Sequence, residues 1–425
     1  MKLKYNPGLY RRAVDAHRGL SRLRALRLRL MEHTYGRQWS DLITTDDGRI
    51  LSEYDHALES GMRPLTNNLL RSLVKSIVGR FRYNLSTVEK PDGSGDLTAF
   101  REANQINELD SRCLEEFLIS GCVIQKLVCE RRPGSPLAIW ADSICPDDFF
   151  VNRFSDPRGA DVRIIGHFFR VSLAELKLRF GHGSASRCAM LERCYANSSG
   201  FNATDHAAVC HVAEVWSFDI DPASPADDPH WHCRFMAPNG TVLDETRSTL
   251  TSGGHPYAFK FYPLTDGKVH PFIEDLIGQQ KHINILITMI DHILANSAKG
   301  VLLMPMDAIM PESDIRDVSR VWSRPGGVIP VNPAARMMPQ EVSVSSGASR
   351  DASQLLDAEM KLFQQISGVS GALQGQLQAS NVSASLYESQ INNSAIALLD
   401  IYESFNSFRG ARDRIAIEMI NTISH

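Results

Sequence analysis

The stretch HPFIEDLIGQQKHINILITMIDHILANS, residues 270–297, decides the fold class because it contains few helix breakers. At 1.5 Å per residue it predicts a helix of roughly 40 Å. Its first half is amphipathic, with apolar side chains at Ile273, Leu276, Ile277 and Ile283. Its second half, residues 285–294, is apolar nearly all round, which in a soluble protein indicates burial against more than one neighbour.

The same region argues against a membrane anchor. Residues 283–304 are the most apolar part of the chain, yet they include Asn284, Asp291, His292 and Lys299. A membrane-spanning helix rarely tolerates that many polar groups within about 20 residues. We therefore expect no membrane segment.

The flanking sequence predicts a mixed α+β chain. Helical periodicity and composition recur at residues 13–34, 67–79, 98–120, 172–180, 352–366 and 383–422. Short runs bounded by turn residues predict strands at residues 122–128, 161–171, 209–219 and 327–331. The segment 300–333 is rich in proline and glycine, so it is expected to form a compact excursion after the long helix. At 425 residues the chain should fold as two or three subdomains.

Composition is that of an ordinary globular protein. Hydrophobic residues make up 43%, charged residues 22%, and the net charge is -4, which excludes a disordered chain and a polycationic nucleic-acid coat. Charge is nevertheless uneven, because residues 1–30 carry nine lysines and arginines against Asp15 alone. This basic segment has two interpretations: contact with nucleic acid, or pairing with acids on a neighbouring subunit.

No catalytic motif is present. The glycines of residues 368–375 are not followed by Lys-Ser or Lys-Thr, and neither HExxH nor GxSxG occurs. The eight cysteines are sparse for a disulfide scaffold, and the N-terminus lacks a secretory signal, so reduced thiols in a cytoplasmic protein are expected.

A group of cysteines and histidines falls within about 45 residues. It comprises Cys188, Cys194, His206, Cys210, His211, His230, His232 and Cys233. Zinc ligands usually come in closer pairs, whereas five residues separate Cys188 from Cys194. Partly buried thiols and surface histidines are the simpler interpretation, so no metal, cofactor or catalytic residue is expected.

Five short motifs follow one another along residues 35–390. They are Tyr35-Gly-Arg-Gln-Trp39, Arg63-Pro-Leu-Thr-Asn-Asn68, Cys145-Pro-Asp-Asp-Phe-Phe-Val-Asn152, Gly254-His-Pro-Tyr-Ala-Phe259 and Ile366-Ser-Gly-Val-Ser370 with Ser383-Ala384. In this order they resemble segments of the portal proteins of podovirus-like tailed bacteriophages. Two details depart from that pattern: Gly36 directly follows Tyr35, and Ala384-Ser385 stands where a glycine-containing pair is usual.

The resemblance implies a ring, generally of twelve subunits, at one capsid vertex. On that plan residues 1–269 form a mixed α/β wing, 270–299 a stem helix and 300–333 a small clip. Residues 334–382 return to the wing and channel with a helix and a glycine-rich loop. Residues 383–425 form a C-terminal helix in a short crown or in the wing.

The resemblance also implies how such a ring would work. A terminase motor would drive double-stranded DNA through it, and neck or tail adaptor proteins and major capsid or scaffold protein would bind it. DNA would pass without sequence-specific contacts, and the basic N-terminal segment would lie on the outer wing. The location would be the virion vertex, reached from the host cytoplasm during assembly.

Residues of the long helix are the site candidates. The channel-facing candidates are Gln280, Lys281, Asn284, Asp291 and Lys299. The ring-interface candidates are Ile285, Ile287, Ile290 and Leu294.

Two other classes of protein remain open. A head–tail adaptor or minor capsid protein would also form a ring without catalysis, but adaptors are usually much shorter. A metal-dependent enzyme built on the Cys/His group is the remote alternative.

Overall fold

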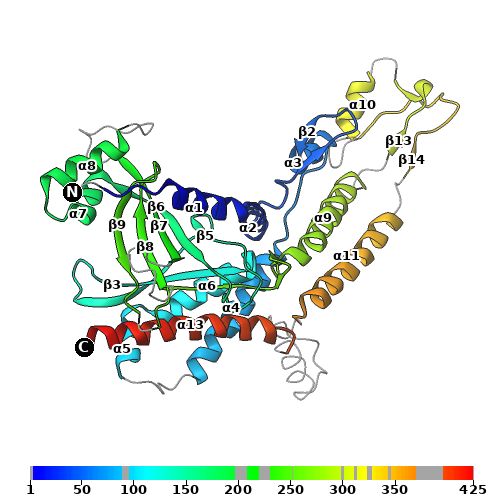
Figure 1. The fold of residues 1–425 in the computed structure, drawn as a ribbon. Helices are drawn as coiled ribbons and strands as arrows, with labels where there is room; N and C mark the ends of the chain where they lie inside the picture. The colour runs from blue at the N-terminus through cyan, green and yellow to red at the C-terminus, as the bar shows by residue number, and fades with distance from the viewer. Residues whose placement is uncertain are drawn as a thin grey trace. The chain divides into compact units, whose positions relative to one another are not determined.

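A computed structural model of the chain describes residues 3–88, 95–196, 208–219, 230–250, 252–297, 301–310, 314–322, 328–342, 346–369 and 396–424. It confirms the α+β fold class (Figure 1). The chain divides into two compact units. Unit 1 consists of residues 1–34, 70–275 and 369–425, and unit 2 of residues 35–69 and 276–368.

Unit 1 contains a five-stranded antiparallel sheet in the order β5-β6-β7-β8-β9. Its strands are β5 (Phe149–Val151), β6 (Ile164–Ser172), β7 (Val209–Asp219), β8 (His230–Met236) and β9 (Val242–Arg247). Consecutive strands are neighbours throughout, although α7 (Leu173–Phe180) and α8 (Ala185–Tyr195) lie between β6 and β7 in the sequence. All three residues of β5 are buried, so this edge strand is covered on both faces.

A second antiparallel sheet of unit 1 has the order β10-β3-β4. Its strands are β3 (Cys122–Arg131), β4 (Leu137–Ser143) and β10 (Tyr257–Phe261). Gly121 ends the helix before β3 with a φ of 68°. A Cβ there would lie 2.4 Å from Val269 and 3.0 Å from the Tyr262 carbonyl oxygen, so only glycine fits this turn.

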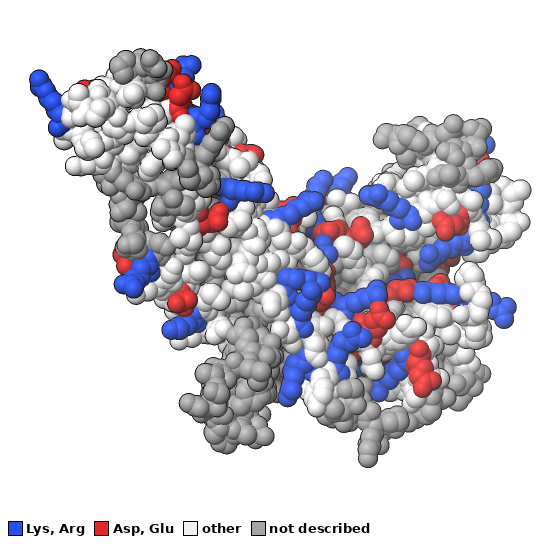
Figure 2. Space-filling view, turned by 180° about the vertical axis from the view of Figure 1, so that it is seen from behind, with Lys and Arg blue, Asp and Glu red and all other residues white. Residues whose placement is uncertain are grey.

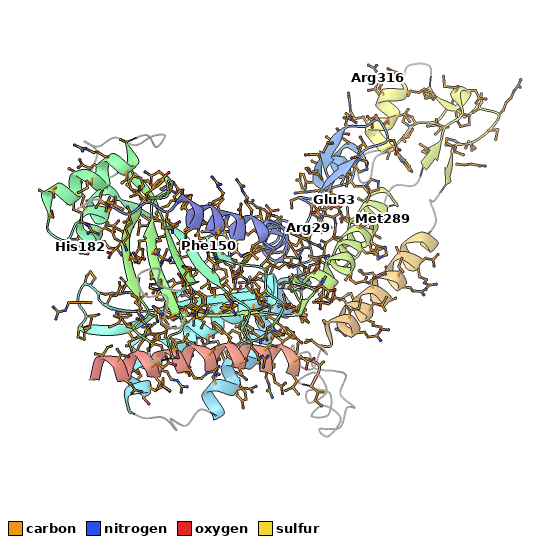
Figure 3. All side chains as sticks on the ribbon, in the orientation of Figure 1. Arg29, Glu53, Phe150, His182, Met289 and Arg316 are labelled. Carbon is orange, nitrogen blue, oxygen red and sulfur yellow. The ribbon has the colours of Figure 1, made fainter. Side chains whose placement is uncertain are left out.

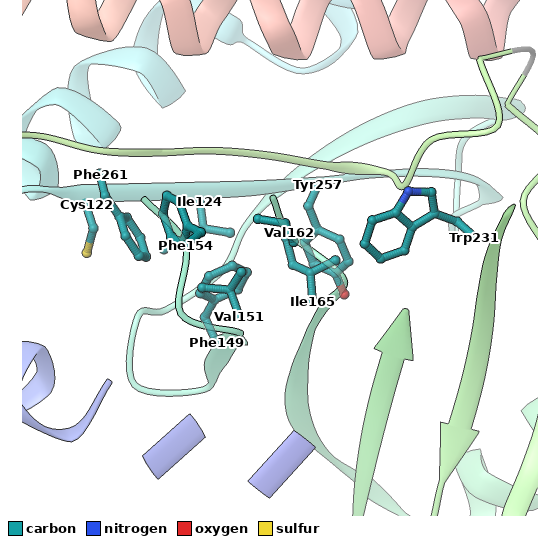
Figure 4. Packing of buried hydrophobic residues seen from close by; sticks show 10 residues of the cluster. All are labelled: Cys122, Ile124, Phe149, Val151, Phe154, Val162, Ile165, Trp231, Tyr257 and Phe261. Atoms are coloured by element: carbon teal, nitrogen blue, oxygen red, sulfur yellow. The ribbon is translucent and has the colours of Figure 1, made fainter. Parts of the chain in front are cut away.

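Buried side chains from both sheets form one core cluster (Figure 4). Val151 and Ile165 come from the five-stranded sheet, and Ile124 and Tyr257 from the three-stranded sheet. Rings dominate this core: the Phe149 and Tyr257 centroids lie 6.2 Å apart. Contacts of this kind hold the two sheets together mainly by removing aromatic surface from water.

Eight helices of unit 1 surround these sheets in the described residues. They are α1 (Pro7–Gly19), α2 (Ser21–Thr34), α4 (Leu69–Val88), α5 (Gly95–Ala103), α6 (Ile106–Ser120), α7 (Leu173–Phe180), α8 (Ala185–Tyr195) and α13 (Leu399–Ser424). Two predicted helices are each divided. The one at 13–34 breaks at Leu20, and the one at 98–120 breaks before Ile106, where Gln105 has a φ of 48°. The helix predicted at 383–422 begins at Leu399 in the described residues, since 370–395 lie outside them.

A small hairpin, β11 (Leu264–Thr265) and β12 (Lys268–Val269), completes unit 1. Its two turn residues, Asp266 and Gly267, have φ of 52° and 73°. Two successive positive φ angles are the requirement of the tightest hairpin turn, and Asp-Gly is the pair that adopts them most readily.

Unit 2 is smaller. It holds β1 (Leu42–Thr44), β2 (Ile50–Ser52), α3 (Glu53–Glu59), α9 (Ile277–Ser297), β13 (Val301–Leu303), η2 (Met306–Ala308), α10 (Ile315–Trp322), β14 (Gln340–Val342) and α11 (Ser346–Ser367). A single 3-10 turn, η1 (Glu274–Leu276), precedes α9. The strand predicted at 327–331 is wrong for the described residues 328–331, because Val331 forms only an isolated bridge with Ile309. Residues 323–327 lie outside the described part of the chain.

The long predicted helix is present but shorter. Because residues 274–276 form the 3-10 turn, regular α-helix starts at Ile277. Among the described helices, none combines the length and the apolar character needed to cross a bilayer. The wing, stem and clip boundaries stay predictions, and the grouping of residues 35–69 with α9 was not foreseen.

Candidate functional site

Helix α9 holds an extended chain segment through three polar side chains. Gln280, Asn284 and Thr288 recur at every fourth position, which places them on one face of the helix. Each accepts a hydrogen bond from a backbone N–H of the segment 65–69. The donors are Leu69 to Gln280 at 2.9 Å, Asn67 to Asn284 at 3.0 Å, and Leu65 to Thr288 at 3.0 Å.

The spacing explains why three bonds form at once. Four helical residues rise about 6.0 Å, and two extended residues rise about 6.6 Å, so alternate N–H groups match every fourth side chain. The Gln280 amide also donates to the Asn67 carbonyl at 2.6 Å, and the Asn284 amide donates to Gln38 at 2.6 Å. We call this set, Gln280, Asn284 and Thr288 with residues 65–69, the amide ladder.

The amide ladder corrects two site assignments. Gln280 and Asn284 were expected to face a channel, but their exposed fractions are 0% and 1%. Both side chains accept hydrogen bonds from backbone N–H groups that would otherwise lack these partners, and the Asn284 amide group donates to the Gln38 side chain. Helical periodicity identifies a polar stripe but does not say whether the stripe meets water or another part of the chain.

The other channel-facing candidates lie differently. The Lys281 ammonium pairs with Asp41, directly before β1, at 2.7 Å and with Glu53, on α3 of the same unit, at 2.6 Å. Asp291 is exposed on the last turns of α9. Lys299 lies outside the described residues. The channel-facing role of these three residues stays a prediction.

A second face of α9 packs against α11. Ile283 and Leu286 are buried on α9, and Phe363 is buried on α11. A hydrogen bond joins the same helices, because His282 Nδ1 lies 3.0 Å from a Glu359 carboxylate oxygen. The contact between the two helices is therefore apolar with a hydrogen bond at its side.

The remaining face of α9 exposes large apolar side chains. Ile285 and Met289 are each 42% exposed and Leu294 is 53% exposed, while Ile287 and Ile290 are half-buried. Figure 3 labels Met289 on this helix. Helix α11 adds Leu355, Leu362 and Ile366, which are also exposed and share one face at spacings of seven and four. Sequence reasoning missed this second stripe, although its spacing was readable.

A buried ionic cluster fixes α13 in unit 1. Asp110 on α6 and Arg412 on α13 are both fully buried, and their side chains are hydrogen-bonded to each other. Arg409 Nε donates to the second Asp110 oxygen at 2.7 Å, and Asp413 pairs with both Arg101 and Arg412. We call Asp110, Arg409, Arg412, Asp413 and Arg101 the ionic cluster.

A second buried polar group lies between the two sheets of unit 1. Lys126 on β3 pairs with Glu214 on β7 at 2.5 Å, and Trp216 Nε1 donates to Glu214 at 2.9 Å. Burial acts to raise the pKa of Glu214, but the Lys126 ammonium prevails and holds that pKa below its usual value. His167 lies nearby, its Nδ1 2.8 Å from the Tyr257 hydroxyl, and burial lowers the pKa of His167 to about 4.

The Cys/His group predicted at 188–233 is dispersed. Cys210 and Cys233 are buried in the five-stranded sheet, and the rings of His230 and His232 lie 4.6 Å apart. Burial raises the pKa of the Cys233 thiol well above its usual value, which keeps it protonated. In the described part of the chain no three such side chains form a metal cluster, and His206 lies outside it.

The basic N-terminal segment is folded into unit 1. Leu9 and Ala13 of α1 are buried against the five-stranded sheet, and Arg27 of α2 pairs with Glu116 and Asp147. On the face drawn in Figure 2, cationic and anionic side chains are interspersed, not gathered by sign. This distribution is unlike the continuous cationic stripe of a dedicated DNA-binding protein.

A protein-family model described as Phage P22-like portal protein matches residues 129–424, more than two thirds of the chain. The chain belongs to this portal family. The resemblance drawn from short motifs is thereby confirmed. No curated protein matches the chain.

Membership of the portal family has direct consequences. Portal proteins are structural, so the chain is a structural phage protein and not an enzyme. The family implies an oligomeric ring in the phage capsid, located at the capsid vertex. Both alternatives, an adaptor and a Cys/His enzyme, give way to this assignment.

Proposed function

We propose that the chain is one subunit of a ring, of about twelve copies as in the resembling portals, that forms a DNA channel. The observation that supports this most is the exposed apolar surface of α9 and α11, which we call the stem face. It consists of Ile285, Met289, Leu294, Leu355, Leu362 and Ile366. A monomer would leave this surface in water, whereas neighbouring copies would bury it.

In this proposal DNA passes through the ring during packaging by a terminase large subunit and again during exit. A channel must let DNA slide, so it should not hold many phosphates at once. The net charge of -4 and the neutralised Lys281 agree with weak, sequence-independent DNA contact. Asp291 and Lys299 remain candidates to line the channel, where each would be repeated once per subunit.

The proposed partners follow from the same position at the capsid vertex. Major capsid or scaffold protein would contact the outer part of the ring, and neck or tail adaptors would bind after packaging. The segment 300–333, which contains β13 and α10, is the proposed clip that meets terminase and adaptors. Ile287 and Ile290, half-buried beside the stem face, would add to the contact between copies.

Electron microscopy of the purified chain tests the ring. We expect rings with a central hole for the natural sequence. Changing Ile285→Asp together with Met289→Asp should abolish them, because two charges would be buried at every contact between copies. The control is Leu178→Asp on α7, an 85% exposed leucine of unit 1, which should assemble normally.

Two outcomes would contradict the proposal. A natural chain that stays monomeric at all concentrations is not a ring subunit. Rings that persist in the Ile285→Asp, Met289→Asp variant would place the contact between copies somewhere other than the stem face.

A further inference from the structure

A closed ring of identical subunits needs two different surface patches on each chain, because the contact between neighbours is head-to-tail. The stem face contains only apolar side chains, so it is not a pair of unlike patches. A head-to-tail contact joins two unlike patches that complement each other in charge and shape. This inference rests on the ring proposed above.

The first patch is a pocket in unit 1 with a volume of about 710 Å³. Helices α1 and α2 form one wall, and the β11–β12 hairpin forms the opposite wall. Its floor is apolar and includes Leu23, Val151 and Phe261, which belong to or pack on the core cluster of Figure 4. The floor can therefore accept apolar side chains from outside.

The rim of this pocket is cationic. Five exposed cations line it, against two exposed acids, Asp15 and Asp266; the cations are Arg12, Arg22, Arg153, Arg163 and Lys268. Asp15 Oδ1 lies 3.8 Å from Nη1 of Arg18. In the part of the chain that the structure describes, none of the five cations has an ion pair.

The geometry of the rim is fixed by secondary structure. Arg22 is on α2, and Lys268 directly follows the Asp266-Gly267 turn on the opposite wall. The Arg163 guanidinium lies 4.9 Å above the Phe218 ring, which orients it without neutralising it. The occupant of this pocket should therefore be acidic and should also carry apolar side chains.

The second patch is on unit 2 of the same chain. Residues 41–61, which form β1, β2 and α3, carry six carboxylates against Arg49 alone. Their apolar side chains are exposed: Leu42 is 72% exposed, Ile50 68%, and Tyr54 and Leu58 each 47%. We call residues 41–61 the acidic module.

Contacts within unit 2 leave the acidic module negatively charged. Lys281 compensates Asp41 and Glu53, and Arg49 pairs with Asp47 and Glu59. Six carboxylates and two cations leave an excess of four negative charges. Asp46 and Asp55 are exposed and take part in no ion pair among the described residues.

We propose that the acidic module of one subunit docks into the cationic pocket of the next subunit around the ring. Exposed apolar residues such as Ile50 and Leu58 would reach the floor, and Asp46 and Asp55 would meet the rim. Duplex DNA matches the rim charge but offers no apolar groups for the floor. An acidic module on every copy supplies both features at once.

Charge exchange between copies tests this contact. The pocket-reversed variant carries Arg22→Glu and Lys268→Glu, and the module-reversed variant carries Asp46→Lys and Asp55→Lys. All four side chains are exposed, so circular dichroism should report an unchanged fold. The control carries Arg131→Glu and Arg170→Glu, two exposed arginines of unit 1 outside the pocket.

Mass photometry at about 0.1 M salt would measure assembly, since attraction between exposed charges is only partly screened there. Each reversed variant alone should need at least about tenfold more protein to half-assemble than the natural chain, because like charges then meet at every contact. An equimolar mixture of the two variants should assemble as the natural chain does. One chain carrying all four substitutions should do so too, and the control should be unaffected.

Three results would overturn the inference. The first is normal assembly by both reversed variants. The second is failed assembly that neither the mixture nor the four-substitution chain restores, which would show that the pocket and the acidic module do not meet each other. The third is loss of DNA binding by the pocket-reversed variant while its rings persist.

The ring itself is judged separately. If the natural chain forms no rings but the two reversed variants bind each other in pairs, the docking contact holds and the ring proposal fails. If rings form and the variants behave as the natural chain, the ring proposal holds and the docking contact fails.

Discussion

Two long helices of this portal-family chain are anchored by opposite kinds of polar chemistry. Helix α13 of unit 1 is held by the ionic cluster, in which the fully buried Asp110 and Arg412 bear full charges. Helix α9 of unit 2 is held by the amide ladder, in which Gln280, Asn284 and Thr288 are neutral. Both devices join parts of the chain that are distant in sequence.

The two anchors differ in the free-energy cost of losing one interaction partner. A buried charge without its partner retains a large desolvation penalty, whereas an amide without its partner loses one hydrogen bond. A partly formed ionic cluster is therefore strongly disfavoured, so α13 is either fully docked in unit 1 or not docked. The amide ladder can lose one of its bonds and still keep α9 in register.

Removal of the central carboxylate should have the largest effect. Asp110→Ala leaves Arg412 and Arg409 without their common partner and should lower the free energy of unfolding of unit 1 by about 3–5 kcal/mol. The control is Glu108→Ala on the same helix, which breaks only the exposed pair with Arg112 and should cost less than about 1 kcal/mol. Urea denaturation measures both, and equal losses would refute the contrast between buried and exposed pairs.

Loss of one amide should have an intermediate effect. Asn284→Ala leaves the Asn67 N–H without its acceptor and should cost about 1–3 kcal/mol. Hydrogen exchange at Asn67 should become faster, while exchange at Leu65 and Leu69 should change less. Met289→Ala on the exposed face of α9 is the control and should leave all three amides as they are. Unchanged exchange at Asn67 would mean that the ladder does not protect it.

Acid should destabilise unit 1 gradually and leave the amide ladder of unit 2 unaffected. Burial lowers the pKa of His167 and of His255 to about 4, from an ordinary value of 6.5. Between those values the unfolded chain binds protons that the folded chain does not, so unit 1 loses stability as the pH falls from about 6.5 to about 4. The slope is at most about 1.4 kcal/mol per pH unit for each histidine.

Thermal unfolding at pH 7, 6 and 5 would measure this slope. His167→Gln keeps a polar group near the Tyr257 hydroxyl and should make the slope shallower. The amide ladder contains no group that titrates in this range, so the protection of the Asn67 amide, its exchange rate relative to the intrinsic rate at the same pH, should stay constant. A slope that His167→Gln leaves unchanged would show that this histidine does not titrate on unfolding.

The fold was largely predictable from local patterns. The long helix at 270–297, the α+β class and the portal resemblance all rest on periodicity or on short motifs, and each was confirmed. Boundaries were less accurate. The helix at 13–34 breaks at Leu20, directly after Gly19, a residue type that weakens a helix.

Site details were less predictable because they depend on contacts between distant residues. Gln280 and Leu69 are 211 positions apart, and Asp110 and Arg412 are 302 apart. A helical period reports which residues share a face, and it contains no information about what that face meets. For this reason Gln280 and Asn284 were assigned to a channel, and the acidic module went unnoticed.

The ionic cluster also affects when unit 1 can finish folding during synthesis. Asp110 leaves the ribosome about 300 residues before Arg412, which at roughly 5–20 residues per second is a delay of about 15–60 s. During that delay α6 carries a carboxylate with neither of its arginines, so unit 1 cannot reach its final packing. The folding of unit 2 is likewise delayed, since residues 35–69 are synthesised long before α9, which belongs to the same unit. Only a chain synthesised past Arg412 can complete the packing of unit 1, so the surfaces of this unit are finished late in synthesis.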